Sequence, residues 1–221
     1  MRAYLVWGVR RSPKVIPNAL RDLRYGWPLA GTIKTRYAHL GARNTTNADY
    51  GDLALLFAAA EVQLDDVIVD VGCGKGRALN WFLGHFPGNR IIGIELDPEI
   101  CARTARRLRR HRQVTVVCGD ASTMLPRDAT LFYLFNPFDR AATMRFRDAL
   151  LEARAGAIGR TRIVYYFARE LAVFEQDTRF AVEYLRIPRL TLPSALIDVR
   201  LRPGEPRHSC ATAFQRRSNQ G

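Results

Sequence analysis

A glycine-rich loop is the first feature of this sequence that can do chemistry. The letters DVGCGKG, residues 70–76, follow a run of β-branched apolar residues and precede a helical pattern. Alternating glycines at such a strand-to-helix turn let the backbone approach a ligand and present amide N–H groups at the amino end of a helix. The spacing GxGxG differs from the dinucleotide fingerprint GxGxxG, so alone it leaves open a tight turn that binds nothing.

Polar residues follow three further strand patterns. Glu95 comes directly after the second strand, Asp120 follows the third, and Asn136-Pro137-Phe138 follows the fourth. The carboxyl ends of adjacent parallel strands meet at one edge of an α/β sheet, which is where such sheets bind ligands. A carboxylate at Glu95 can accept hydrogen bonds from both hydroxyls of a ribose, and Asp120 can accept one from an adenine amino group. We therefore expect a nucleotide-like ligand at this edge.

These motifs together resemble those of the class I S-adenosylmethionine-dependent methyltransferases, over residues 45–167. The letters DVGCGKG are similar to the first motif of that family, IGIELD to its acidic motif after the second strand, and GDA to its adenine motif. The resemblance implies S-adenosylmethionine as the cofactor, with the loop at its methionine and ribose portions, one acid at the ribose and the other at the adenine. The cofactor-binding residues that it implies are Asp70 beneath the loop, Gly72, Gly74, Gly76, Glu95, Leu96, Asp120 and Ala121.

Asn136-Pro137-Phe138 is similar to the (N/D)PP(F/Y) motif of amino-group methyltransferases, with one proline fewer. In that family the Asn carbonyl accepts a hydrogen bond from the target nitrogen and the aromatic ring stacks on the target. The resemblance thus implies catalytic roles for Asn136 and Phe138, and Asn136 is also placed in the cofactor site. The nearest likeness is to small bacterial methyltransferases with GCGKGR and FNPF motifs. It implies methyl transfer to a nitrogen or oxygen acceptor; a related protein that binds the cofactor for non-methylating chemistry is the alternative.

Three residues near the loop are further candidates for the cofactor site. The Thr46 hydroxyl can bind the methionine carboxylate, Tyr50 can cover the sulfonium, and Lys75 can attract the carboxylate. Each has a structural alternative, such as a helix cap for Thr46 and a solvated first-turn side chain for Lys75. Of the adjacent residues Tyr165 and Tyr166, one ring is expected to face the cleft.

The elements that must position these residues alternate between strand and helix. Short apolar runs predict buried strands, and apolar residues at helical spacing predict helices. The predicted strands are 67–71, 90–94, 114–118, 130–135, 162–167, 180–187 and 195–202, and the predicted helices are 48–64, 75–86, 98–112, 140–155 and 169–176. This order predicts an α/β fold with a doubly wound, mostly parallel seven-stranded sheet and helices on both faces. The short connection between the last two strands predicts a hairpin with one antiparallel strand.

The chain of 221 residues divides into three parts by composition. Residues 1–47 are irregular and predict an N-terminal cap or lid segment. Residues 48–208 carry the motifs and predict a single cofactor-binding domain, which is long enough to bury its own core. Residues 209–221 predict a polar tail.

The composition is strongly basic, with 34 Lys and Arg against 21 Asp and Glu and a net charge of +13. This charge favours acidic partners. The short chain, without an appended recognition domain, favours a small-molecule acceptor, while the charge supports RNA or a protein lysine as the alternative. The cations are spread over both termini and the helix 98–112, whose arginines are expected to be solvated. Nucleic acid is therefore not the favoured partner.

Cysteine and histidine are too scattered to indicate a built site. The 4 cysteines and 4 histidines form no CxxC and no paired histidine spacing, so the sequence predicts neither a metal site nor a disulfide framework. No apolar run reaches the length that spans a bilayer, and the first residues lack the apolar region of a signal peptide. We expect a cytoplasmic protein without a membrane partner, as a monomer or a homodimer.

Overall fold

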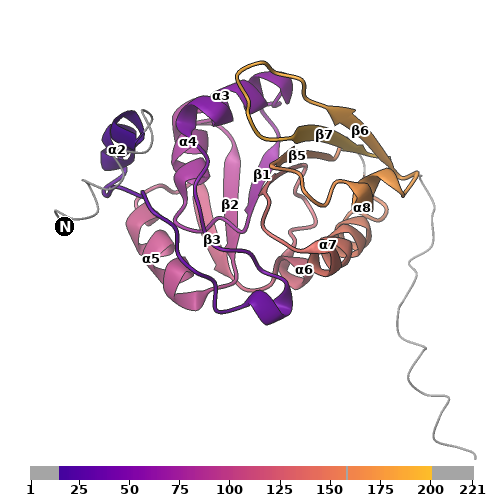
Figure 1. Ribbon diagram of the computed structural model, residues 1–221, viewed down its shortest axis with the longest axis horizontal. Helices are drawn as coiled ribbons and strands as arrows, with labels where there is room; N and C mark the ends of the chain where they lie inside the picture. Colours follow the sequence, from indigo (N-terminus) through magenta and orange to yellow (C-terminus); the bar gives the residue numbers. More distant parts are fainter. Residues whose placement is uncertain (1–14, 158, 201–221) are drawn as a thin grey trace, which may run out of the picture.

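One mixed sheet organises the computed structural model, which describes residues 15–157 and 159–200 (Figure 1). The strands are β1 (Val67–Val71), β2 (Arg90–Glu95), β3 (Val114–Cys118), β4 (Leu131–Phe135), β5 (Arg162–Tyr166), β6 (Phe180–Tyr184) and β7 (Ser194–Val199). They lie in the order β3-β2-β1-β4-β5-β7-β6. The first five strands are parallel neighbours, whereas β7 runs antiparallel to both β5 and β6. The predicted fold class is confirmed, including the final hairpin.

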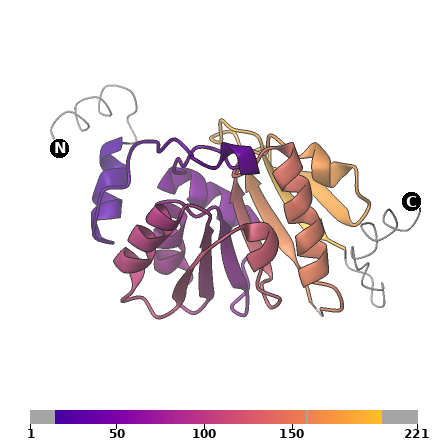
Figure 2. The ribbon, with the colours of Figure 1, turned by 90° about the horizontal axis from the view of Figure 1, so that it is seen from below.

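Helices cover both faces of the sheet (Figure 2). They are α2 (Val15–Leu23), α3 (Tyr50–Ala59), α4 (Arg77–His85), α5 (Pro98–Leu108), α6 (Ala121–Met124), α7 (Arg140–Ala153) and α8 (Ala172–Glu175), with the short 3-10 helix η1 (Ala38–Leu40). One hydrophobic core lies between the sheet and α3, α4 and α5, and a second lies between the sheet and α6, α7 and α8. No helix of the described residues is long and apolar enough to cross a membrane.

The two cores follow from the alternation of side chains along each strand. In β1, Ile68 belongs to the first core, whereas Val69 and Val71 belong to the second. Successive side chains of a strand point to opposite faces, so a continuous apolar run supplies both cores at once. Asp70 interrupts this run on the Ile68 side, and its side chain is buried. A carboxyl group in that position is unusual in a core strand and indicates a role at the strand end.

Local backbone geometry makes several helices shorter than their sequence patterns. The helix expected from residue 75 starts at Arg77, because Gly76 holds the left-handed conformation at its amino end. The helix expected over 48–64 ends at Ala59, before Glu61 with its φ of 48°. The helix expected over 98–112 starts at Pro98 as predicted, since Asp97 caps it by accepting hydrogen bonds from the amides of Glu99 and Ile100, and it ends at Leu108.

The N-terminal segment crosses the carboxyl edge of the parallel strands (Figure 2). Within residues 15–47 it contains α2, η1 and an isolated bridge from Ala42 to Phe138. The division of the chain at residues 47 and 208 stays a prediction. The predicted tail, 209–221, lies outside the described residues.

A disulfide between Cys101 and Cys118 corrects the expectation from cysteine spacing. The two residues are 17 apart in sequence, one in the first turn of α5 and the other at the end of β3. Because α5 packs against β3, their Cα atoms lie 5.7 Å apart, within reach of a disulfide. Cysteine spacing in the sequence could not predict this disulfide, because the packing of a helix against a strand brings its two cysteines together.

Candidate functional site

The glycine loop folds back over the end of β2. The amides of Gly72 and Cys73 both donate to the Ile94 carbonyl, each at 2.9 Å. Gly74 has a φ of 53°, and a Cβ added to it would lie 2.5 Å from the Thr45 Cγ2 atom of the N-terminal segment. Only glycine fits such a close approach in that conformation. The loop is therefore enclosed between β2 below and residue 45 above.

Glu95 ties the loop to the start of α5. Its Oε2 atom accepts a hydrogen bond from the Gly74 amide at 2.7 Å, and its Oε1 atom accepts one from the Asp97 amide at 2.9 Å. Burial raises the pKa of Glu95, and these two amides oppose the rise. Each carboxylate oxygen has a second lone pair, so Glu95 can hold the loop and still accept from hydroxyl groups of a ligand.

Asp70 lies beneath the loop in the buried end of β1. Burial and the nearby Glu95 charge raise the pKa of Asp70 to about 8. Asp70 is therefore mostly protonated at pH 7. A neutral acid next to Glu95 avoids placing two buried negative charges side by side.

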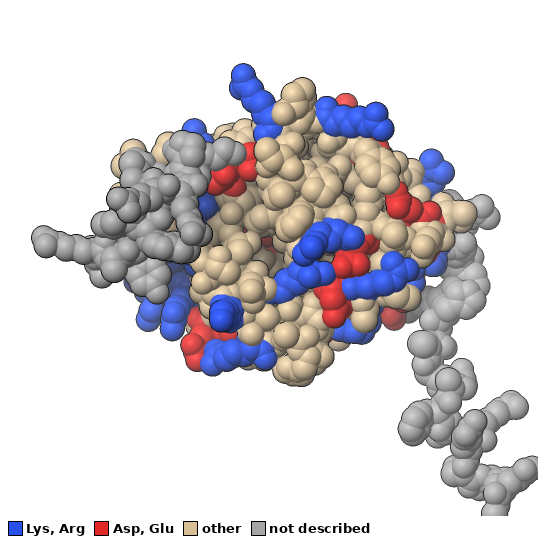
Figure 3. Space-filling view, viewed as in Figure 1, with Lys and Arg blue, Asp and Glu red and all other residues tan. Residues whose placement is uncertain are grey.

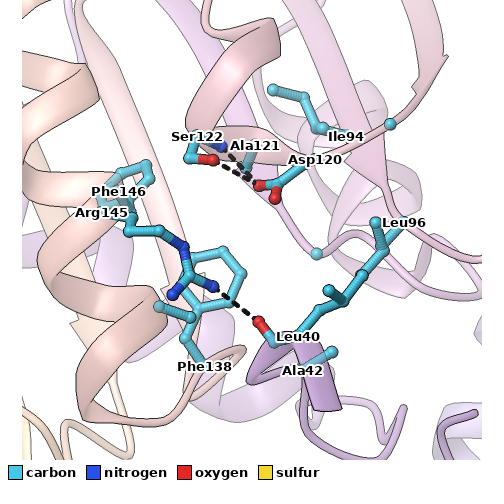
Figure 4. A pocket seen from close by; sticks show the side chains of 13 residues that line it. Leu40, Ala42, Ile94, Leu96, Asp120, Ala121, Ser122, Phe138, Arg145 and Phe146 are labelled. Atoms are coloured by element: carbon cyan, nitrogen blue, oxygen red, sulfur yellow. Dashed lines mark hydrogen bonds between the residues drawn. The ribbon is translucent and has the colours of Figure 1, made fainter. Parts of the chain in front are cut away.

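A pocket beside β2 and β3 has apolar walls and one carboxylate (Figure 4). Leu96 and Ala121 line it, and Asp120 lies at its rim as the cap of α6. The Asp120 Oδ1 atom accepts from both the amide and the hydroxyl of Ser122, each at 2.8 Å. A slot of this kind suits a flat, apolar ring that carries an amino group.

A second pocket continues from the first one. The two share the lining residues Ala42, Gly72, Leu96 and Phe138, so together they form one cleft. Thr46, Glu95 and Asn136 line this second part. Asn136 has a φ of 43° and is only 8% exposed, and its Oδ1 atom has no hydrogen-bond partner among the described residues.

Residues 38–46 form a strap across the cleft. The Arg43 amide donates to the Pro137 carbonyl at 3.0 Å, and the Asp139 amide donates to the Gly41 carbonyl at 2.8 Å. Two arginines add side-chain contacts to the strap. Arg145 donates a hydrogen bond to the Leu40 carbonyl at 2.7 Å (Figure 4), and Arg43 forms a salt bridge with Glu170 at 2.7 Å. The strap is thereby fixed to the loops that follow β4 and β5.

The structure brings most of the predicted residues to this cleft and leaves others away from it. Gly72, Glu95, Leu96, Asp120, Ala121, Asn136, Phe138 and Thr46 line its two parts. Tyr50 is 3% exposed and its hydroxyl donates to Asp22 Oδ1 at 3.0 Å. Lys75 donates to the carbonyls of Ala30 and Gly31 at 3.0 and 2.6 Å. The remaining predicted residues, Asp70, Gly74 and Gly76, support the loop from below or within.

The arginines of α5 divide into two kinds. Arg103, Arg106 and Arg109 are exposed, as expected of a solvated helix. For Arg107 that expectation is wrong, because this side chain turns toward the glycine loop and donates to the Lys75 carbonyl at 2.8 Å. Sequence reasoning also missed the strap residues Leu40 and Ala42, which lie in an irregular stretch without periodicity.

The tyrosines at the end of β5 do not line the cleft. Tyr165 and Tyr166 are both buried, at 0% and 2% exposure. The Tyr166 hydroxyl donates to Asp52 Oδ2 at 2.8 Å, and burial is the main cause of its raised pKa. Both rings are part of the two cores that support the sheet.

Comparison with known proteins agrees with this geometry. Residues 68–154 match a family model described as a methyltransferase domain. These residues contain the glycine loop and the ends of β2, β3 and β4 that form the floor of the cleft. No curated protein sequence matches the chain.

Solved structures share the fold at low sequence identity. The mitomycin 7-O-methyltransferase is 18% identical with a TM-score of 0.53, over 68% of this chain and 53% of that chain. Human N-acetylserotonin methyltransferase in complex with S-adenosylmethionine is 12% identical with a TM-score of 0.55, over 68% and 52%. A precorrin-6y C5,15-methyltransferase from Geobacter metallireducens is 16% identical with a TM-score of 0.54, over 71% and 90%. The chain thus spans about half the length of the first two proteins.

The sheet order and the helices on both faces are those of the Rossmann-like fold that these methyltransferases share, in agreement with the fold that the sequence resemblance implies. The individual roles of the site residues stay predictions.

Proposed function

We propose that this protein transfers a methyl group from S-adenosylmethionine to a nitrogen or oxygen atom of a small molecule. The observation that carries this proposal is the buried Asn136 side chain. Its Oδ1 atom lines the cleft and has no hydrogen-bond partner among the described residues. A buried acceptor without a partner costs about 1–3 kcal/mol, so it indicates a ligand that donates to it.

The cleft fits the cofactor in its chemistry. Glu95 offers carboxylate lone pairs for the two ribose hydroxyls, while Leu96 and Asp120 offer an apolar wall and an acceptor for an adenine ring. Thr46 lies on the strap side, where its hydroxyl can donate to the methionine carboxylate. When bound, S-adenosylmethionine would supply a methyl group already activated on a sulfonium, so the chain has to orient the reactants and exclude water.

The residues after β4 are placed to orient the acceptor. The Asn136 Oδ1 atom accepts an N–H or O–H of the acceptor, which directs the lone pair of the attacking atom. Phe138 lines both parts of the cleft and contributes an apolar wall. The strap lies over this region, and its backbone bonds to Pro137 and Asp139 hold it against the loop that follows β4.

A macromolecular acceptor, RNA or a protein lysine, is the alternative that the net charge of +13 favours. On the face that carries the strap, Lys and Arg side chains are spread out, with Asp and Glu among them (Figure 3). Nucleic-acid sites usually gather their cations into a patch or stripe. We therefore favour a small-molecule acceptor over a macromolecular one, and the positive net charge of the protein favours an acidic compound.

Calorimetric titration with S-adenosylmethionine, S-adenosylhomocysteine and NAD tests the proposal. We expect micromolar binding of the two sulfur compounds and none of NAD. Asn136→Ala should lose methyl transfer to the acceptor, and its affinity for S-adenosylhomocysteine measures whether Asn136 also contacts the cofactor. NAD binding in place of the sulfur compounds would show that the glycine loop has been misinterpreted.

A further inference from the structure

Side chains of α5 hold three successive carbonyls of the glycine loop. The Thr104 hydroxyl donates to the Gly74 carbonyl at 2.8 Å. The Nη2 atom of Arg107 donates to the carbonyls of Lys75 and Gly76, at 2.8 and 3.4 Å. The amide of Gly74 donates to Glu95 Oε2 at 2.7 Å, so the loop is held both by α5 and by the end of β2.

The same arginine begins a hydrogen-bonded chain that runs away from the loop. Its Nη1 atom donates to Asn80 Oδ1 at 2.7 Å. The Asn80 Nδ2 atom donates to the Tyr50 hydroxyl at 3.2 Å, and that hydroxyl donates to Asp22 Oδ1 at 3.0 Å. The chain therefore joins the loop to α2, through one residue each of α5, α4 and α3.

Each member of this chain has a fixed direction of donation. The Tyr50 hydroxyl has a single proton, which goes to Asp22, so it can only accept from Asn80. The amide of Asn80 must then present its oxygen to Arg107. Asn80 and Asp22 are fully buried, so water is not a competing partner.

Asp22 is the fixed end of the chain. It accepts two hydrogen bonds from Arg77, at 3.1 and 2.7 Å, and one from the Leu29 amide at 2.9 Å. Arg77 is only 6% exposed, so the pair is buried. Buried ion pairs contribute little net stability and are retained in some proteins because they specify one conformation.

We propose that Asp22, Asn80 and Arg107 are positioning residues for the cofactor loop, although none of them lines the cleft. A loop that holds left-handed glycines at 72, 74 and 76 has few restraints of its own. The chain from α2 restrains it, so that the loop is organised before the cofactor arrives and less binding energy is used to order it. This inference rests on the proposed function for its ligand.

Two variants of the full chain test the inference. Arg107→Ala removes the contacts to both loop carbonyls, and Asp22→Asn keeps the shape of the far end but removes its charge. We expect S-adenosylhomocysteine to bind about tenfold more weakly to each, the equivalent of one or two lost hydrogen bonds. Arg107→Lys has a single ammonium group for the same partners, so its affinity for S-adenosylhomocysteine should lie between those of Arg107→Ala and the wild type. Arg106→Ala, at the exposed neighbouring position, is the control and should bind normally.

Hydrogen exchange of unliganded protein separates this inference from the proposed function. We expect faster exchange of the amides of residues 72–77 in Asp22→Asn, whose side chain does not contact the loop, and no change in Arg106→Ala. If the wild type fails to bind the sulfur compounds, the proposed function is wrong, and the exchange measurement still decides the positioning role. Unchanged loop exchange in folded Asp22→Asn and Arg107→Lys would overturn the inference.

Discussion

Glu95 contacts both the glycine loop and the cleft. It accepts from Gly74 and Asp97 while it lines the part of the cleft predicted to hold a ribose. A carboxylate that only held the backbone would not need to face the cleft, and one that only bound a ligand would not need hydrogen bonds from backbone amides. Glu95 combines the two, so under the proposed function the shape of the loop and the affinity for the cofactor depend on the same side chain.

We predict that Glu95→Ala weakens S-adenosylmethionine binding by about 1–3 kcal/mol, because two ribose hydroxyls lose their acceptors. Calorimetry on the purified variant measures the change. Glu99→Gln, an exposed change in the first turn of α5, is the matched control. Unchanged affinity in folded Glu95→Ala would contradict the assignment of the cofactor site.

A second residue-scale prediction concerns pH. The pKa of Asp70 is raised to about 8, above its ordinary value of 3.8 in the unfolded chain. Between these values the folded protein binds the extra proton, so the contribution of Asp70 to stability is full below pH 4 and is lost as the pH rises to 8. The free energy of unfolding of the wild type should therefore fall between pH 5 and pH 8, and that of Asp70→Asn should fall by at least about 1 kcal/mol less. Urea unfolding at the two pH values measures the difference, and equal losses would show that Asp70 is ionised throughout.

At the scale of the elements, the sequence predicts the strands better than their surroundings. The runs at 67–71 and 114–118 match β1 and β3, because short runs of β-branched residues bounded by turns have few other solutions. The helix at 169–176 shrinks to the single turn of α8, since its pattern is too short to define a period. The strap has no pattern, because its conformation comes from bonds to residues about 100 positions away, such as Arg145.

The disulfide between α5 and β3 gives an element-scale prediction. Closing a loop of 17 residues should stabilise the fold by about 3 kcal/mol. Urea unfolding of the wild type with and without dithiothreitol should show this difference, and the double variant Cys101→Ala with Cys118→Ala should not respond to the reductant. Equal stability of the wild type in both conditions would mean that the thiols are not paired. That result would also suit the expected cytoplasmic location, where thiols are normally kept reduced.

At the scale of the whole molecule, the site uses residues from almost the full length of the described chain. Asp22 and Arg43 come from the N-terminal segment, Glu95 from the middle and Glu170 from beyond β5. The sequence predicted the floor of the cleft, because each floor residue follows its own strand. It predicted a cap or lid over residues 1–47 but not the contacts that hold this segment in place or that support the glycine loop, because ion pairs between distant segments leave no local signal.

We predict that Asp22→Ala makes the full chain less stable by about 3–5 kcal/mol, because Arg77 stays buried and loses its carboxylate partner. Adding Arg77→Met to this variant should recover part of the loss, since it removes the unpaired charge. Urea unfolding of the wild type and the two variants measures both changes. An Asp22→Ala variant as stable as the wild type would show that the pair contributes nothing.

The hydrogen-bonded chain from Arg107 through Asn80 and Tyr50 to Asp22 also limits whether this glycine loop can be grafted into another protein. The letters DVGCGKG look like a portable motif, yet their backbone conformation is supported by side chains from four helices. Grafted into another sheet without Asp22, Tyr50 and Asn80, the loop would keep its glycines and lose its restraint. In an alignment of relatives, these distant positions should accordingly vary together with Arg107 rather than with their own neighbours.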